Sequence, residues 1–295
     1  MKKQTAIILM LIVTIIWGGG FPATKMSLDF GVTVGITNMT RGAIFTLLVL
    51  MFFHKHIFSM KKDDFKIGLL AGLANVAGFL LQTIGTQYTN LSNSAFLTTT
   101  NVVMIPFMAW ILMKKKPQAK NYVAAAICLV GTAVLAGVFQ NGLSFNVGDL
   151  YTLGCAVAFG LSIVFVAMQK SETHFAVGAF MIGLTHFLGG AAYFIFAEGA
   201  QIPSLNWKIA ILPVLYLGIL SSFVAQSLQI VAQRYVSPST ASLVFMFESV
   251  FGSIFSIMFG FESFTFNLLI GGSLIVVSLV VSEVDFKSLK NQNTV

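Results

Sequence analysis

The sequence predicts an all-α integral membrane protein with ten transmembrane helices, arranged as two inverted repeats of five helices. Three observations predict this fold: the bulk composition, a series of ten long apolar segments, and residues that recur at one fixed offset. Hydrophobic residues make up 57% of the chain and charged residues only 9%, whereas a soluble domain carries about 25% charged residues. A soluble protein of this composition would expose large apolar patches and aggregate, so we place most of the chain in a lipid bilayer.

The ten apolar segments are each long enough to cross a hydrocarbon core of about 30 Å. Apolar residues surround each segment and do not form a single stripe, which is typical of helices that contact lipid or other apolar helices. The first segment follows Lys2 and Lys3 in the manner of a signal peptide, but the apolar segments after it indicate a retained helix. The predicted spans are Thr5–Ala23, Val34–Phe53, Ile67–Tyr88, Ala95–Met113, Tyr122–Phe139, Asp149–Met168, Val177–Ala197, Ile209–Ala232, Thr240–Gly260 and Leu268–Val281.

Basic residues gather in alternate loops. One set of loops contains Lys2, Lys3, Lys55, Lys61, Lys62, Lys66, Lys114, Lys115, Lys116, Lys120, Lys170, Arg234, Lys287 and Lys290. The opposite set contains only Lys25 and Lys208. Because basic loops stay on the cytoplasmic side, we predict a multi-pass protein of the cell membrane with both termini in the cytoplasm. This distribution explains the net charge of +7, so we predict no nucleic-acid partner.

The chain also repeats at an offset of 147 positions, with a division near Gly142. This offset aligns Leu81-Gln82 with Leu228-Gln229 and places Asn101 opposite Glu248. A repeat of five spans reverses its direction in the membrane, because five is an odd number. Inverted repeats commonly build transporters whose substrate site lies near the midplane between the halves. We therefore predict two five-helix domains, residues 1–140 and 141–295.

Several short motifs, in this order along nearly the whole chain, resemble the drug/metabolite transporter superfamily of the type built from two EamA domains. They are Trp17-Gly18 with Phe21 late in the first span, Arg41 in the second, and the run 237–241 before Glu248 at the ninth. The resemblance implies a transporter that carries solutes from the inner side to the outside, often an exporter of amino acids, metabolites or toxic compounds. It also implies a central cavity lined mainly by the first, third, fourth, sixth, eighth and ninth helices.

The chain departs from the family pattern in one respect. Ser249 follows Glu248, where the family usually has a proline, whereas the fourth span contains Pro106. The departure leaves the subfamily unassigned.

Charged residues inside the predicted spans are the first candidates for function, because a charge in the lipid core costs about 2.5–3.5 kcal/mol or more. Glu248 would bind a substrate amine or take up a coupling proton; its structural alternative is a pair with Arg41 or a capping role. Arg41 would hold a substrate carboxylate through two hydrogen bonds, and its alternative is to brace helices or to extend toward the interface. His186 in the seventh span would relay protons or, in the alternative that we favour, pack between helices.

Amide side chains inside the spans form a second group of candidates, because each must find a partner in another helix or in a water-filled cavity. The repeat aligns Gln82 with Gln229 and Asn101 with Glu248, so we predict Gln82, Asn101 and Gln229 as polar contacts of the substrate. Hydrogen bonding between helices is the alternative interpretation. The other amides in the spans are Asn38, Asn75 and Gln226.

Aromatic residues are predicted to form the apolar wall of the site. Trp17 and Phe21 lie four positions apart, hence on one helix face, and they flank a run of three glycines before Pro22. They would stack on an aromatic or cationic solute, whereas the alternative for Trp17 is an anchor at the membrane interface. Phe159 occupies the analogous place in the sixth span.

The sequence contains no motif for an enzyme. It lacks a nucleotide-binding loop and a cluster of metal ligands, and Cys128 and Cys155 fall inside apolar stretches, so we predict no cofactor and no metal. We predict a secondary transporter that exports small metabolites, such as amino acids or related amphipathic compounds. We predict protons as its coupling ion. It would work by alternating access around a midplane cavity. The alternatives are a proton-independent facilitator or exchanger, and a non-transporting membrane scaffold or lipid-modifying enzyme.

Overall fold

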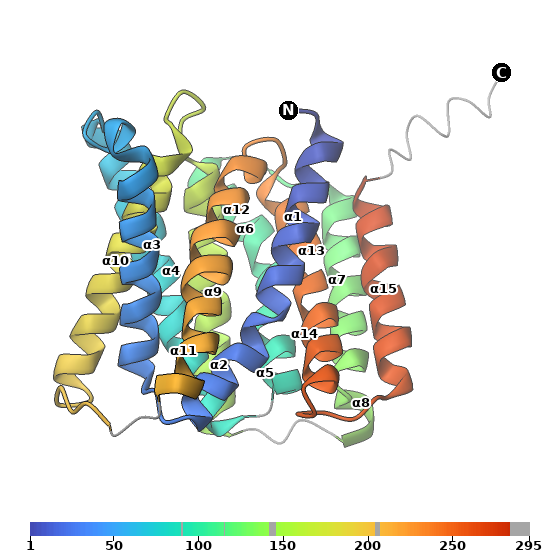
Figure 1. Ribbon diagram of the computed structural model, residues 1–295. Helices are drawn as coiled ribbons and strands as arrows, with labels where there is room; N and C mark the ends of the chain where they lie inside the picture. The colour runs from blue at the N-terminus through green and yellow to red at the C-terminus, as the bar shows by residue number, and fades with distance from the viewer. Residues whose placement is uncertain (90, 115, 142–145, 204–206, 284–295) are drawn as a thin grey trace.

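The computed structural model describes residues 1–89, 91–114, 116–141, 146–203 and 207–283. Over these residues the chain is helical and contains no strand (Figure 1). Eight helical stretches are long and apolar enough to cross a membrane, and the shorter apolar helices Ala119–Leu135 and Phe266–Ser282 bring the number to ten. The predicted all-α fold with ten spans is therefore confirmed.

The elements keep the order of the predicted spans. The first half contains α1 (Lys3–Gly18), α2 (Gly20–Asp29), α3 (Val34–Ile57), α4 (Lys62–Tyr88), α5 (Leu91–Thr99), α6 (Asn101–Met113), α7 (Ala119–Leu135) and α8 (Val138–Asn141). The second half contains α9 (Val147–Ala167), α10 (Phe175–Phe196), α11 (Trp207–Leu215), the π-helix η1 (Tyr216–Val224), α12 (Ala225–Gln233), α13 (Pro238–Phe245), α14 (Phe247–Met258) and α15 (Phe266–Glu283).

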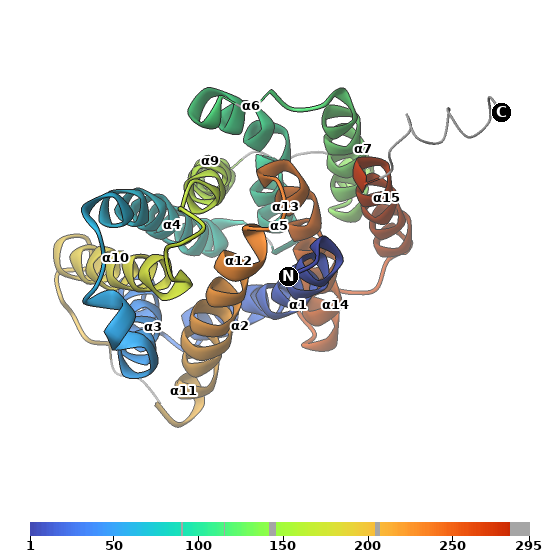
Figure 2. The ribbon, with the colours of Figure 1, turned by 90° about the horizontal axis from the view of Figure 1, so that it is seen from above.

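Helices of the first half pack against helices of the second half. The closest pairs are α3 with α10, α4 with α9, α7 with α15 and α4 with α10, followed by α1 with α12. Seen from above, α1, α12 and α13 lie near the centre, with α3 and α10 at one edge and α7 and α15 at the other (Figure 2). The pairs α3–α10 and α7–α15 join corresponding spans of the two repeats. The pairs α4–α9 and α1–α12 each join the third span of one repeat to the first span of the other. Both patterns are expected for halves related by a pseudo-two-fold axis.

Glycines allow the outer pairs to approach closely. A Cβ atom at Gly42 of α3 would collide with the backbone of Phe187 in α10, and one at Gly271 of α15 would collide with the carbonyl of Gly131 in α7. Small residues at such contacts are typical of membrane helix pairs, because backbones gain van der Waals contact when they come together. These pairs hold the edges of the molecule together around its centre.

Three spans are interrupted near their middle. The first breaks at Gly19 between α1 and α2, within the predicted glycine run. The fourth breaks at Thr100, where the hydroxyls of Thr99 and Thr100 donate 2.7 Å bonds to the carbonyls of Phe96 and Leu97. Such side-chain bonds compete with the helical ladder. The ninth span breaks at Met246, between α13 and α14.

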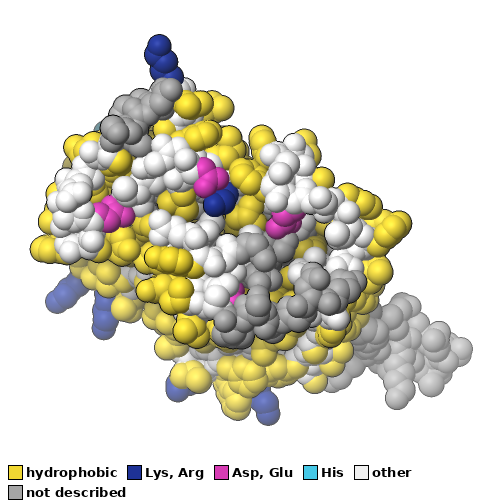
Figure 3. Space-filling view, turned by 90° about the horizontal axis from the view of Figure 1, so that it is seen from below, with side chains coloured by type: hydrophobic (Ala, Val, Ile, Leu, Met, Phe, Trp, Pro, Cys, Tyr) yellow, Lys and Arg dark blue, Asp and Glu magenta, His cyan; other side chains and the backbone are white. Residues whose placement is uncertain are grey.

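The two faces of the molecule differ in charge. The face on which α1 begins, here called the basic face, carries Lys2, Lys3, Lys55, Lys61, Lys62, Lys66, Lys114, Lys116, Lys120, Lys170 and Arg234, with Asp63, Asp64 and Glu172. The opposite face has few charged side chains, set among hydrophobic and uncharged ones (Figure 3), and in the described residues these are Lys25 and Lys208 with Asp29, Asp149, Glu198 and Glu262. The loop charges thus lie on the two faces as the alternating spans require.

Candidate functional site

A central cavity lies where the interrupted spans meet, with an empty volume of about 760 Å³. Its lining comes from both halves of the chain, including α1, α2, α4, α9, η1, α12 and α14. Ligand sites in helical membrane proteins commonly lie between helices in this way. The structure brings together around it all eight residues that the sequence predicted for the site: Trp17, Phe21, Arg41, Gln82, Asn101, Phe159, Gln229 and Glu248. The structure shows that these residues line one cavity, while their roles stay predictions.

Arg41 provides the positive charge of the cavity. Its side chain is only 2% exposed. The guanidinium donates from Nε to the hydroxyl of Ser222 at 3.1 Å and from Nη2 to the hydroxyl of Ser221 at 3.3 Å. It also lies 4.1 Å from the centre of the Phe79 ring, a cation–π geometry. Two hydroxyls and one aromatic face therefore hold the guanidinium in place at the cavity wall.

The serines that hold Arg41 belong to η1, the π-helical segment of the eighth span. A π-helix widens the turn and changes which backbone groups are bonded, and such segments are frequent at functional sites. Here the carbonyl of Ser221 accepts a 3.0 Å bond from the indole Nε1 of Trp17. Tyr216, at the start of η1, donates its hydroxyl to the carbonyl of Ile16 at 2.7 Å, next to the break at Gly19. The π-helix thus connects Arg41 to the interrupted first span.

Glu248 provides the negative charge of the cavity. It lies in the first turn of α14, immediately after the break at Met246. A carboxylate in this position is stabilised by the partial positive charge of a helix N-terminus. In the described part of the chain no ion pair within 4.0 Å joins Glu248 to Arg41. The direct pair that we considered as a structural alternative is therefore absent.

Amide side chains give the cavity additional polar groups. Gln229 donates from Nε2 to Oε1 of Gln233 at 3.1 Å, while its own Oε1 is buried without a hydrogen-bond partner. The same is true of one amide oxygen in each of Asn75, Asn101 and Gln226. A buried acceptor left without a partner costs about 1–3 kcal/mol. A ligand that donates hydrogen bonds here would remove that cost.

Aromatic rings form the apolar wall. Phe159 meets Phe79 edge to face, with ring centres 4.8 Å apart. Trp17 lies against Phe245 at 5.3 Å. Phe21 packs with Leu91 and Ala95 on the side of the opposite face. The cavity therefore combines two separated charges with flat hydrophobic surfaces.

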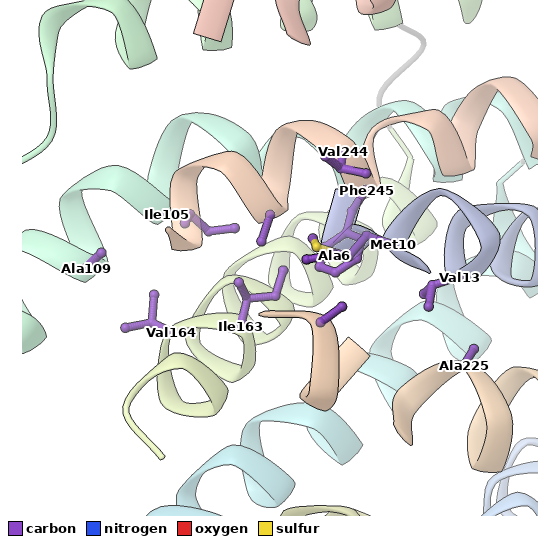
Figure 4. Packing of buried hydrophobic residues seen from close by; sticks show 12 residues of the cluster. Ala6, Met10, Val13, Ile105, Ala109, Ile163, Val164, Ala225, Val244 and Phe245 are labelled. Atoms are coloured by element: carbon purple, nitrogen blue, oxygen red, sulfur yellow. The ribbon is translucent and has the colours of Figure 1, made fainter. Parts of the chain in front are cut away.

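A layer of buried apolar side chains, here called the apolar layer, separates the cavity from the basic face. Its principal members are Met10, Ile105, Ile163 and Phe245 (Figure 4). Ile163 and Phe245 also line the cavity, whereas Ala109 of the same cluster lines a second hollow that opens on the basic face. We call this second hollow the vestibule. In the described conformation the two are separate hollows, and the hydrogen bond from Gln229 of the cavity to Gln233 of the vestibule joins their linings beside this layer.

Comparison with known proteins assigns the chain to a family. Two segments, residues 4–137 and 146–283, match the EamA-like transporter family. The chain belongs to this family. As an EamA-like protein it is a transporter and not an enzyme, and its apolar helices make it a multi-pass membrane protein.

Relatives of this EamA-like chain extend the match over nearly its whole length. A protein of Archaeoglobus fulgidus, named an uncharacterized transporter, is 29% identical over 280 residues, covering 95% of this chain and 86% of the relative. The uncharacterized transporter YvbV of Bacillus subtilis is 24% identical and covers 98% of this chain and 94% of its own length. A solved crystal structure superposes with a TM-score of 0.73 at 18% identity, covering 95% of this chain and 96% of that one. That structure supports the fold.

His186 and Asn38 lie outside the lining of the cavity. The ring of His186 forms a 2.9 Å hydrogen bond from Nε2 to Oδ1 of Asn38 and stacks on Phe79 at 4.9 Å. Asn38 also donates to the carbonyl of Val34 and the hydroxyl of Thr83. Both residues are therefore satisfied in the contact of α10 with α3 and α4, which agrees with the packing interpretation of His186.

Sequence reasoning missed several groups at the site. It did not select Phe79, or the serine pair Ser221-Ser222, and it ranked Asn75 and Gln226 below the other amides. The serine pair had a usable signal, because two adjacent hydroxyls in an apolar span must bond within the protein. Phe79 had none, since 29 phenylalanines are spread along the chain.

Proposed function

We propose that this transporter exports small solutes that carry both an ammonium and a carboxylate group, such as amino acids. One observation carries the proposal: Arg41 and Glu248 line the same cavity with opposite charges and form no ion pair with each other. A zwitterion placed between them would direct its carboxylate to Arg41 and its ammonium to Glu248. Charge-assisted hydrogen bonds of this kind are stronger than neutral ones.

The remaining lining fits the rest of such a solute. The amide oxygens of Asn101 and Gln229 would accept hydrogen bonds from the ammonium group. The rings of Trp17, Phe21 and Phe159 would contact an apolar or aromatic side chain. Gln82 would add a polar contact from the first half. The solute class is therefore amphipathic, with a charged end and an apolar end.

The mechanism that we propose is alternating access between two inverted halves, residues 1–140 and 141–295. Helices of each half pack against helices of the other half, which supports this division. The interruptions of the fourth and ninth spans, which occupy corresponding places in the two halves, also support it. Interrupted helices near the midplane commonly form transporter sites. The apolar layer would open when the halves move. The excess of basic groups on one face supports its placement in the cytoplasm of the cell.

Glu248 has a second role to be weighed, because a buried carboxyl group can also take up a coupling proton. A proton antiporter needs a pH gradient to concentrate its solute, whereas a facilitator or exchanger does not. Transport by wild-type protein with and without an imposed pH gradient separates the two. A non-transporting scaffold would move no solute in either condition.

The decisive experiment is transport by purified protein in liposomes. We would measure the uptake of labelled L-leucine and L-phenylalanine, together with the matched amines that lack the carboxylate and the matched acids that lack the ammonium. The proposal expects saturable transport of the complete zwitterions and little transport of either truncated analogue. If the amines were transported as fast as the zwitterions, Arg41 would have no role in recognising the carboxylate. If no solute were transported under any gradient, the proposal would be refuted.

A further inference from the structure

The vestibule is the larger of the two hollows and opens on the basic face. Its empty volume is about 1530 Å³, twice that of the central cavity. Neither Arg41 nor Glu248 lines it, so it is a site distinct from the central cavity. Four basic side chains contribute to its lining, from Lys3, Lys116, Lys120 and Arg234. Among the described residues that line it, none is acidic.

Arg234 is the best-placed of these basic groups. It follows α12 and donates one hydrogen bond, from Nη1 to the carbonyl of Ser171 at 3.3 Å. Its Nε and Nη2 atoms are buried and have no hydrogen-bond partner. Burial lowers the pKa of Arg234, as expected for a cation taken out of water. The guanidinium is thus anchored at one nitrogen and has two donors left for a ligand.

Backbone groups at the same vestibule also favour an anion. α7 begins at Ala119, and its preceding residue Gln118, which lines the vestibule, makes no side-chain capping bond. α13 also begins at the vestibule, but Pro238 has no N–H group and the hydroxyl of Ser237 caps this end by accepting from the N–H of Thr240 at 3.1 Å. The N-terminus of a helix presents N–H groups and a partial positive charge, which together bind phosphate and similar anions. The uncapped N-terminus of α7 and the guanidinium of Arg234 therefore meet at one hollow.

We propose that the vestibule binds a phosphate group and that Arg234 is its principal recognition residue. A phosphate has enough oxygens to accept from the guanidinium fork and from backbone N–H groups at once, whereas a carboxylate has only two. The group can come from the headgroup of an anionic phospholipid in the adjoining leaflet or from free phosphate in solution. The inference does not depend on which solute crosses the central cavity.

The test measures binding, without any gradient, in two arms. In the first, purified protein in a phosphate-free detergent buffer is titrated with labelled inorganic phosphate. In the second, native mass spectrometry counts retained phosphatidylglycerol against phosphatidylcholine. Binding in the first arm identifies free phosphate as a ligand, and selective retention of phosphatidylglycerol in the second identifies a headgroup.

Three variants make the test specific to Arg234. Arg234→Gln removes both the positive charge and the paired N–H donors of the guanidinium. It should weaken binding at least about 10-fold, because hydrogen bonds to charged groups are among the stronger ones. Arg234→Lys keeps the charge without the fork and should give an intermediate loss. Lys55→Gln removes one exposed charge from the same face, outside the vestibule, and should bind like the wild type.

Three results would overturn the proposal: no binding of either ligand to the wild type, equal binding by Arg234→Gln, or an equal loss in Lys55→Gln. The last would mean that net charge alone attracts the anion. Failure of amino-acid transport would leave all of these measurements intact, so the two proposals can fail separately.

Discussion

The central cavity and the vestibule are both hollow and both charged, yet they are built in opposite ways. The cavity holds one buried charge of each sign, Arg41 and Glu248, against walls of aromatic rings. The vestibule is larger, and the charged side chains of its described lining are all basic. Between them lies the apolar layer.

This difference indicates a division of tasks. A hollow lined by one sign of charge attracts any counter-ion and raises its local concentration. A small cavity with two opposite, fixed charges selects for a solute whose own charges have matching signs and spacing. We therefore expect changes in the cavity to alter which solutes are moved, and changes in the vestibule to alter anion binding without altering that choice.

The largest effect is expected for Glu248→Gln in the cavity. The substitution keeps the shape of the side chain and removes its charge, so Arg41 and a bound ammonium both lose their counter-charge. Losing one partner of a buried charged contact costs about 2 kcal/mol or more, or about 30-fold in transport rate at low solute concentration. Initial uptake rates of L-leucine in liposomes measure this effect. Glu172→Gln, an exposed acid on the basic face, is the matched control, and unchanged uptake in Glu248→Gln would refute the assigned role.

The apolar layer between the two hollows can be tested by Ile105→Ala. Ile105 is fully buried on α6, whereas Ile111 on the same helix is 65% exposed to the surroundings. Removing buried methyl groups leaves a space that neighbours fill incompletely, so we expect a loss of about 2 kcal/mol or more in the free energy of unfolding. Denaturant unfolding in detergent measures it. Ile111→Ala should lose far less, and equal losses would mean that the layer is not tightly packed.

A smaller effect is expected for Arg41→Lys. Lysine keeps the positive charge but cannot donate to Ser221 and Ser222 while also binding a carboxylate in a planar fork. The loss of a charged hydrogen bond, about 1.5 kcal/mol, should raise the KM of the zwitterion about 10-fold. The slow transport expected of the matched amine, which has no carboxylate, should not fall further. The comparison with Arg234→Lys is informative, because that variant should leave the same KM unaltered.

The smallest effect is expected outside both hollows, at the start of α10. The His174 ring stacks on His56 with centres 3.7 Å apart, and its Nδ1 accepts from the backbone N–H of Ala176 at 3.3 Å. Burial lowers the pKa of His174, and the neighbouring His56 and Arg234 lower it further. The unfolded chain, with a histidine pKa of about 6.5, then binds a proton more readily than the folded protein. Stability is therefore fully present above about pH 6.5 and is lost as the pH falls through the folded value.

The measurement is the melting temperature between pH 7.5 and 5.5. His174→Asn keeps a residue suited to capping the helix and should flatten the pH dependence slightly. The exposed His54→Asn should leave it unchanged. A wild-type slope in His174→Asn would assign the pH dependence to other groups.

Sequence reasoning reached the fold and much of the site because the bilayer makes polar residues conspicuous. Arg41, Asn101 and Glu248 stood out in apolar spans, and all three line the cavity. It failed where backbone geometry decides. The break at Thr100 and the π-helix from Tyr216 to Val224 cannot be predicted from hydropathy. Hydropathy contains no information on which carbonyl accepts the hydrogen bond of each backbone N–H group.

The sequence by itself determined membrane residence, the ten spans and the two faces of unequal charge, because these follow from the cost of placing polar groups in hydrocarbon. Only the tertiary structure decided that Arg41 bonds to Ser221 and Ser222 and not to Glu248, and that Arg234 faces a hollow lined by two helix ends. Those outcomes depend on contacts between residues up to 181 positions apart in the chain. They depend on how the helices pack, which local composition does not encode.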